Sequence, residues 1–164
     1  MKYLITCYLF LLLSLSAFAQ SPTTDSLKVI NYADFVRLSQ QKGNDTTYLV
    51  NFWATWCRPC MAEIPDFVKL DSAYFNKKIK VIFISLDFPN NLKNVKKTAQ
   101  IRKMNRVFLL DADNPNKWIN ETDEKWSGSI PATIIYQNGA KLFFHEGQLT
   151  FSELDQLAKK YIVP

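Results

Sequence analysis

The chain has 164 residues, which is enough for one ordinary domain and too few for two well-packed ones. Its net charge is +5, but acidic residues are interspersed among the basic ones. This pattern is typical of a solvated charged surface rather than of a nucleic-acid-binding stripe, so we predict no nucleic-acid partner.

Residues 1–19 have the features of a secretory signal peptide. Lys2 precedes an apolar run over 3–15, and small residues precede the expected cleavage after Ala19. The run is shorter than the roughly 20 residues of a membrane-spanning helix. We therefore predict export to a periplasmic or other extracytoplasmic compartment. The alternative is an uncleaved anchor, which would be the chain's only membrane contact.

Residues 20–26 are expected to form a polar linker, and residues 27–164 are expected to fold as one domain. In chain order, this domain opens with a short edge strand, a helix that Asn31 caps and Gly43 ends, and a buried apolar strand. These three elements are expected over 27–30, 32–41 and 47–53.

Cys57 and Cys60 follow the buried strand and precede a helix expected over 61–75. The helix dipole favours a thiolate at this terminus, and the two-residue spacing lets Cys60 close a disulfide on Cys57. We predict that Cys57 is the nucleophile and Cys60 the buried resolving residue. Arg58 adds a cation beside the nucleophile, and Pro59 fits the first turn of a helix.

A cysteine pair of this spacing is also half of a zinc site, which would need two further Cys or His ligands. The chain offers Cys7, which falls within the predicted signal peptide, and His145, its one histidine. We expect His145 on a surface strand, with nothing to place it near Cys57. The sequence therefore predicts redox chemistry, with no metal and no cofactor.

Two more strands and a basic helix follow the helix of the cysteines. The strands are expected over 80–86 and 106–110. Between them we expect a helix that Asn90 or Asn91 caps and that ends near residue 104.

The end of the chain combines a short helix, a hairpin and a terminal helix. Asn138-Gly139 is a strong hairpin signal, and Thr150 with Glu153 forms a capping box. These elements are expected over 117–123, 132–136, 141–144 and 150–161. Strands that alternate with helices and then close on a hairpin predict an α/β fold with a central mixed sheet flanked by helices.

Two motifs make the chain similar to a known family. In this order and at this separation, they resemble the thioredoxin-fold, exported TlpA/ResA-like thiol–disulfide oxidoreductases. The resemblance runs from about residue 27 to the C-terminus. It implies a thioredoxin fold with an N-terminal extension and a strand–helix insertion near 88–104. The motifs are FWATWCRPC at 52–60 with EIP at 63–65, and GSIPAT at 128–133.

The resemblance also implies an enzyme that exchanges disulfides with protein clients, either disulfide- or dithiol-bearing. It favours a monomeric reductant that receives electrons from a membrane partner. Pro131 would be a cis-proline beside the disulfide, and Ile130 would present its backbone to an extended substrate. Trp56, Arg58 and Pro59 would complete the substrate-binding surface.

Thioredoxins carry a buried aspartate where this chain has Asn51, which cannot accept a proton. Glu63 matches a glutamate that ResA-like proteins place near their cysteines, and it follows Cys60 by one helical turn. We expect Glu63 to be a mobile carboxylate that takes or delivers the proton of the resolving thiol. The alternative is a solvent-exposed glutamate favoured by the helix dipole.

A thioredoxin-fold binding or metal-delivery module without turnover is the alternative function. Copper-delivery relatives of this fold use a wider cysteine spacing and a partner histidine. Peroxidase relatives place their reactive cysteine after a Pro-X-X-X-Thr-X-X pattern, which this chain lacks. Both departures favour thiol–disulfide exchange.

Overall fold

The computed structural model describes residues 27–161, so the predicted signal peptide (1–19) and linker (20–26) lie outside the described residues. Six strands form one mixed sheet in the order β1-β4-β3-β2-β5-β6. The strands are β1 (Lys28–Ile30), β2 (Thr47–Trp53), β3 (Ile79–Ser85), β4 (Val107–Leu110), β5 (Ala132–Gln137) and β6 (Ala140–Glu146). The helices are α2 (Tyr32–Ser39), α3 (Arg58–Ala73), α4 (Leu92–Ile101), α5 (Pro115–Thr122) and α6 (Phe151–Tyr161), with a 3-10 turn η2 (Pro89–Asn91).

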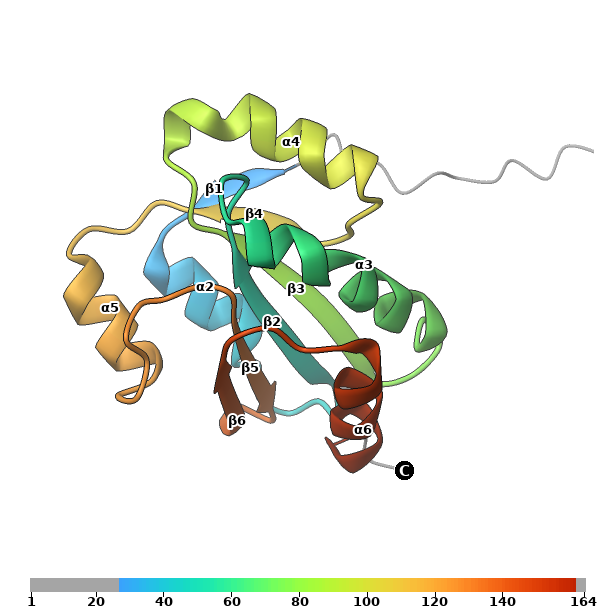
Figure 1. The fold of residues 1–164 in the computed structure, drawn as a ribbon. Helices are drawn as coiled ribbons and strands as arrows, with labels where there is room; N and C mark the ends of the chain where they lie inside the picture. The colour runs from blue at the N-terminus through green and yellow to red at the C-terminus, as the bar shows by residue number, and fades with distance from the viewer. Residues whose placement is uncertain (1–26, 162–164) are drawn as a thin grey trace, which may run out of the picture.

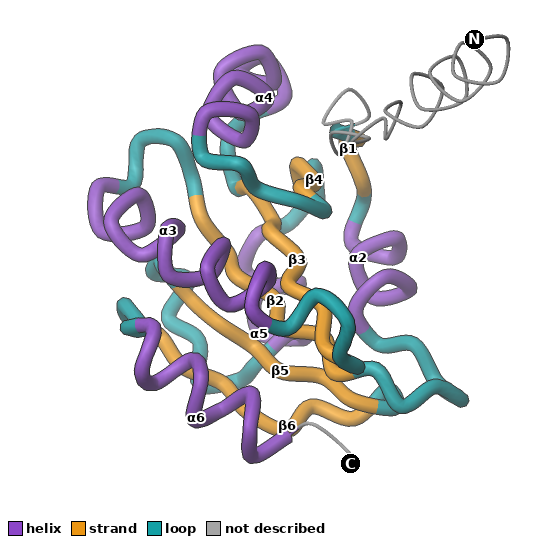
Figure 2. The backbone as a smooth tube through the Cα atoms, turned by 90° about the vertical axis from the view of Figure 1, so that its right-hand side faces the viewer, coloured by secondary structure: helices purple, strands orange, loops and turns teal. Residues whose placement is uncertain are grey.

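The first four strands of the sheet order run parallel, whereas β5 is antiparallel to β2 and β6 is antiparallel to β5. Helices α3, α4 and α6 pack on one face of the sheet, and α2 and α5 pack on the other (Figure 1). Figure 2 shows α3 and α6 on one side of the strands and α2 on the opposite side. The predicted fold class, a central mixed sheet flanked by helices, is confirmed.

Strand β2 lies inside the sheet, between the two layers of helices, and all seven of its residues are buried. Successive side chains of a strand point to opposite faces. Leu49 and Trp53 therefore lie in the core under α3, whereas Val50 and Phe52 lie in the core under α2 and α5. By the same alternation, Asn51 faces α3, the helix that carries the two cysteines.

Helix α3 begins at Arg58, three residues earlier than expected from the sequence. Cys57 is its N-cap, with an extended backbone and a sulfur that accepts a hydrogen bond from the backbone N–H of Cys60. Because Pro59 lacks an N–H that would need a partner in the first turn, the helix can start before it. Cys60 is therefore inside the first helical turn rather than in front of it.

The segment between β3 and β4 contains the inserted helix expected near 88–104. Residues 89–101 form η2 and α4, and the strand β4 follows from Val107. The predicted side-chain cap at Asn91 is wrong, because Asn91 makes no side-chain capping bond to α4. Its side-chain amide instead donates hydrogen bonds to the Asp87 carboxylate and the Thr55 hydroxyl.

The hairpin and the terminal capping box are confirmed. Asn138 and Gly139 have φ values of 48° and 79°, the left-handed pair that a two-residue hairpin turn requires. The side chains of Thr150 and Glu153 exchange hydrogen bonds with each other's backbone at the start of α6. Both features fix the path of the chain from β5 to α6, which passes beside the cysteines.

No helix within residues 27–161 is long and apolar enough to cross a membrane.

Candidate active site

Cys57 and Cys60 form a disulfide at the N-terminus of α3, with their Cα atoms 5.3 Å apart. The backbone N–H of Cys60 donates to Cys57 Sγ at 3.2 Å. Cys57 keeps 4% of its surface exposed and Cys60 none. When the disulfide is reduced, the sulfur nearer solvent is thus also the one that a helix N-terminus and a backbone N–H stabilise as a thiolate.

The second motif lies against the first because β5 pairs with β2. Ala132, the first residue of β5, is opposite Phe52, near the end of β2 that leads to the cysteines. The Ile130–Pro131 peptide bond just before β5 is cis. Cys57 Sγ lies 3.6 Å from the Ile130 carbonyl oxygen. The structure therefore brings together two segments that are more than seventy residues apart in sequence.

Glu63 is buried on the inner face of α3, with 2% of its surface exposed. Its Oε1 accepts a hydrogen bond from Asn51 Nδ2 at 2.7 Å, and its Oε2 accepts one from the Leu149 backbone N–H at 3.0 Å. The alternative of a solvent-exposed glutamate is wrong. Burial on the core side of the helix and two donors from other parts of the fold hold this side chain in place.

The environment of Glu63 changes its proton affinity. Burial raises the pKa of Glu63 from the ordinary 4.5 to about 7, because the charged form loses its hydration. The hydrogen bonds from Leu149 and Asn51 oppose this rise, and the nearby charge of Asp66 adds to it. A carboxyl with a pKa near neutrality exchanges protons readily at physiological pH.

The loop between β6 and α6 is tied to the start of α3 by two bonds. One is the bond from Leu149 to Glu63, and the other runs from Gln148 Nε2 to the Pro59 carbonyl oxygen at 2.9 Å. The sequence places the capping box at Thr150 but contains no signal for the contacts of the two residues before it.

On the other side of the disulfide, the loop before Cys57 is held by the buried Asp87. Its carboxylate accepts hydrogen bonds from the Thr55 backbone N–H at 2.9 Å and from the Ser85 hydroxyl at 2.8 Å. Asn91 Nδ2 donates to the same carboxylate at 2.6 Å. Asp87 therefore joins the ends of β2 and β3 and the start of α4 under the active-site loop.

The surface around the disulfide is apolar and aromatic on its exposed side. Trp56 exposes 65% of its surface and Phe88 exposes 77%. Arg58 and Pro59 are exposed as well, and Ile130 is half-buried. Trp56, Arg58, Pro59 and Ile130 are therefore available to a partner that approaches the sulfurs, whereas Pro131 is buried.

His145 lies on β6, opposite Thr133 of β5. It is half-buried rather than on the open surface, and its ring stacks on Phe143. Within residues 27–161, no three His, Cys, Asp or Glu side chains gather closely enough to hold a metal ion.

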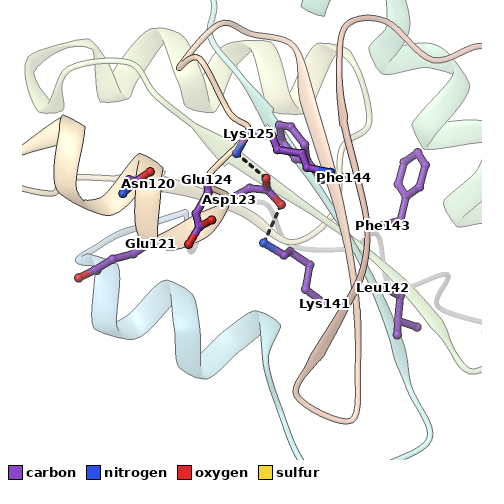
Figure 3. A pocket seen from close by; sticks show the side chains of 9 residues that line it. All are labelled: Asn120, Glu121, Asp123, Glu124, Lys125, Lys141, Leu142, Phe143 and Phe144. Carbon is purple, nitrogen blue, oxygen red and sulfur yellow. Dashed lines mark hydrogen bonds and ion pairs between the residues drawn. The ribbon is translucent and has the colours of Figure 1, made fainter.

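A hollow of about 540 Å³ lies between the end of α5 and β6. Figure 3 shows Lys141 reaching across it to Asp123, with an ion pair at 2.6 Å. Burial alone would raise the pKa of Asp123, but hydrogen bonds from Lys141 and the Lys125 backbone lower it below its ordinary value. No residue of the predicted site lines this hollow, and its central charges pair with each other. The lining residues are Asn120, Glu121, Asp123, Glu124, Lys125, Lys141, Leu142, Phe143 and Phe144.

Comparisons with known proteins match most of the described chain, including both motifs. The AhpC/TSA family matches residues 25–143. The thioredoxin-like protein YneN of Bacillus subtilis is 30% identical over 119 residues, which cover 72% of this chain and 66% of that protein. The thiol-disulfide oxidoreductase ResA of Geobacillus thermodenitrificans is 26% identical over 121 residues, covering 73% and 64%. The match thus spans just under two thirds of the length of these relatives.

Among solved structures, a thiol:disulfide interchange protein of the thioredoxin family from Chlorobium tepidum superposes with a TM-score of 0.61. Its sequence identity is 23%, and the match covers 71% of this chain and 80% of the other. At this identity the likeness shows the fold alone. The fold, the two motifs and the family match together establish that this chain belongs to the AhpC/TSA family of thioredoxin-like proteins, with ResA and YneN among its relatives.

Proposed function

We propose that this protein is an extracytoplasmic thiol–disulfide oxidoreductase that acts on protein clients through Cys57 and Cys60. The observation that carries the proposal is the redox pair at the N-terminus of α3, backed on its inner side by the buried Glu63. The names of its relatives, thiol-disulfide oxidoreductase and thioredoxin-like protein, support the same chemistry.

The reaction begins when the Cys57 thiolate attacks a disulfide of the client. A bond forms between Cys57 and one client sulfur, while the other client sulfur leaves as a thiolate and takes a proton. Cys60 then attacks Cys57, the mixed disulfide breaks, and the second client thiol is released. Two electrons pass to the client, and the protein is left with the Cys57–Cys60 disulfide.

The second step needs a proton acceptor, because Cys60 is fully buried and burial raises the pKa of a thiol. Glu63 lies one helical turn after Cys60, on the same face of α3. We assign to its carboxylate the role of taking the Cys60 proton, and to its carboxylic acid the role of returning it in the reverse reaction.

Clients would contact the exposed surface around the sulfurs. Trp56, Arg58 and Pro59 flank the nucleophile, and Ile130, which precedes the buried Pro131, lies against it from the other side. An extended client segment would pair with the Ile130 backbone, which brings its disulfide next to Cys57.

The direction of electron flow, the compartment and the partners are further parts of the proposal. The similarity to ResA-like proteins and the signal-like segment 1–19 support a monomeric reductant outside the cytoplasm that a membrane protein re-reduces. Such a reductant should have a reduction potential nearer to the about −270 mV of thioredoxin than to the about −120 mV of a strong oxidant. Equilibration in glutathione buffers measures this potential.

Reduction of insulin disulfides by the full chain with a thiol donor tests the proposed activity. We expect turnover by the wild type and none by Cys57→Ala, with Cys7→Ser as a matched control that keeps full activity. A binding or metal-delivery module of the same fold would be inert in this assay, so an inactive wild type would overturn the proposal.

A further inference from the structure

Asn51 contacts Glu63 with only one end of its amide. Nδ2 donates to Glu63, but Oδ1 is buried and has no hydrogen-bond partner among residues 27–161. The hydroxyl of Thr133 is in the same condition, and both side chains are fully buried. Buried polar atoms of this kind cost free energy unless they are paired, so two of them side by side require an explanation.

Asn51 and Thr133 are neighbours across the sheet. They are directly opposite each other in the β2–β5 pair, so their side chains point to the same face. The Cβ atoms of such pairs lie about 4.5–5.5 Å apart, within reach of a hydrogen bond between an amide and a hydroxyl after small rotations. Glu63, Asn51 and Thr133 therefore form a row beneath α3.

The chemistry of this row suits a carboxyl group that gains and loses a proton. A charged Glu63 only accepts hydrogen bonds, and Nδ2 of Asn51 is a suitable donor for it. A protonated Glu63 must donate, and Oδ1 of the same amide accepts once the amide has turned over. A hydroxyl both donates and accepts, so Thr133 can pair with whichever end of the amide faces it.

We propose that Asn51 and Thr133 are positioning residues for Glu63. The Asn51 amide and the Thr133 hydroxyl reverse their hydrogen bonds when Glu63 exchanges its proton. The inference rests on the proposed role of Glu63 in thiol–disulfide exchange. This role explains why position 51 carries an amide, since an aspartate there would compete with Glu63 for the same proton. An amide supports both protonation states of its neighbour, whereas an aliphatic side chain supports neither.

Other titratable groups near the row must be separated from it in any test. Asp66 lies on the same helix as Glu63 and acts on its charge, and Cys60 is one turn before it. His145 lies opposite Thr133 on β6. The measurements should therefore use the oxidised protein, with His145→Gln as a control that leaves the Glu63 titration in place.

The titration of Glu63 is measured in the oxidised full-length protein by infrared difference spectroscopy, which follows the carboxyl stretching band as a function of pH. The Glu63→Gln variant assigns the band. Asn51→Leu should raise the pKa of Glu63 by about one unit or more, because the carboxylate loses a donor that favours its charged form. Thr133→Val should lower the pKa, because the protonated state then leaves the Asn51 N–H without an acceptor, and buried N–H groups are left unpaired more rarely than carbonyl oxygens.

Thr133→Ser keeps the hydroxyl and should restore the wild-type pKa. Shifts of opposite sign in Asn51→Leu and Thr133→Val, with rescue by serine, would support the inference. A Glu63 pKa that stays within a few tenths of a unit in Asn51→Leu, or that moves in the same direction in both variants, would overturn it.

The failure of the proposed function would look different. If Glu63→Gln resolves mixed disulfides as fast as the wild type, Glu63 has no role in the exchange, whatever its titration shows. If Glu63→Gln is slow but the Asn51 and Thr133 variants titrate like the wild type, Glu63 keeps its role and the positioning inference is wrong. Thermal unfolding of each variant confirms that it is folded before either result is used.

Discussion

At the scale of single residues, the sequence points to the proposed reacting cysteines but not to their surroundings. Two cysteines at a helix start and a proline before a strand are local patterns, and the structure places both motifs together. The burial of Glu63 is not local. One of its donors, Leu149, is 86 residues away in the sequence, so no spacing argument reveals it. Asn51 attracts notice in the sequence only as a missing acid, whereas the structure makes it a partner of Glu63.

The raised pKa of Glu63 predicts a specific dependence of stability on pH. Between the ordinary 4.5 and about 7 the folded protein holds this proton and the unfolded chain does not. Stability from Glu63 is thus fully present below about pH 4.5 and is lost as the pH rises through about 7, by about 3 kcal/mol in total.

Glu63→Gln removes this dependence, so its stability relative to the wild type should rise between pH 5 and pH 8. Urea unfolding of the two oxidised proteins at both pH values measures the change. The comparison cancels the titration of all other groups that the variants share. A constant difference across this range would show that the pKa of Glu63 is not raised by folding.

At the scale of elements, the active-site loop is fixed by contacts from both sides. Asp87 holds Thr55 from the end of β3, and Gln148 holds Pro59 from the loop before α6. The sequence predicts the strands and the helices that frame this loop. The observed element boundaries differ from the predicted ones where side chains bind partners that are distant in the sequence. Asn91 illustrates the cause, because the amide that suits a helix cap donates to Asp87 instead.

We expect Asp87→Asn to loosen the loop that carries Trp56 and Cys57. The substitution preserves the shape of the side chain but replaces one acceptor oxygen by an N–H₂ group that faces other donors. The loss of charge-assisted hydrogen bonds in a buried site should destabilise the protein by about 2 kcal/mol or more.

Urea unfolding measures this loss, and hydrogen exchange at the Thr55 amide should speed up together with it. Asp113→Asn, at an exposed position, is the matched control and should change neither quantity. Unchanged exchange at Thr55 in a folded Asp87→Asn protein would show that the loop does not depend on this carboxylate.

At the scale of the whole molecule, the alternation of strands and helices predicts the fold class, and the hairpin signal predicts its antiparallel edge. The order of the strands does not follow from the pattern, because β4 lies between β1 and β3 through contacts that depend on the complete sheet. Continuous apolar strands such as β2 show that both faces are covered but not by which helices.

The predicted signal segment belongs to this scale as well. When the full chain is expressed in a bacterium with a signal peptidase, we expect cleavage after Ala19, so that the mature protein begins at Gln20. Intact-mass measurement of the exported protein checks this, with Ala19→Phe as a variant that should block cleavage. A full-length, membrane-bound product from the wild type would establish the uncleaved anchor instead.

Trapping the mixed disulfide tests whether Cys57 attacks a client disulfide and Cys60 resolves the product. Reduced Cys60→Ser protein that also carries Cys7→Ser is mixed with insulin, and peptide mapping by mass spectrometry locates the covalent link. We expect a stable complex through Cys57, and no complex when Cys57→Ser replaces Cys60→Ser. A complex that forms through Cys60 in the Cys57→Ser protein, or in neither variant, would contradict this expectation.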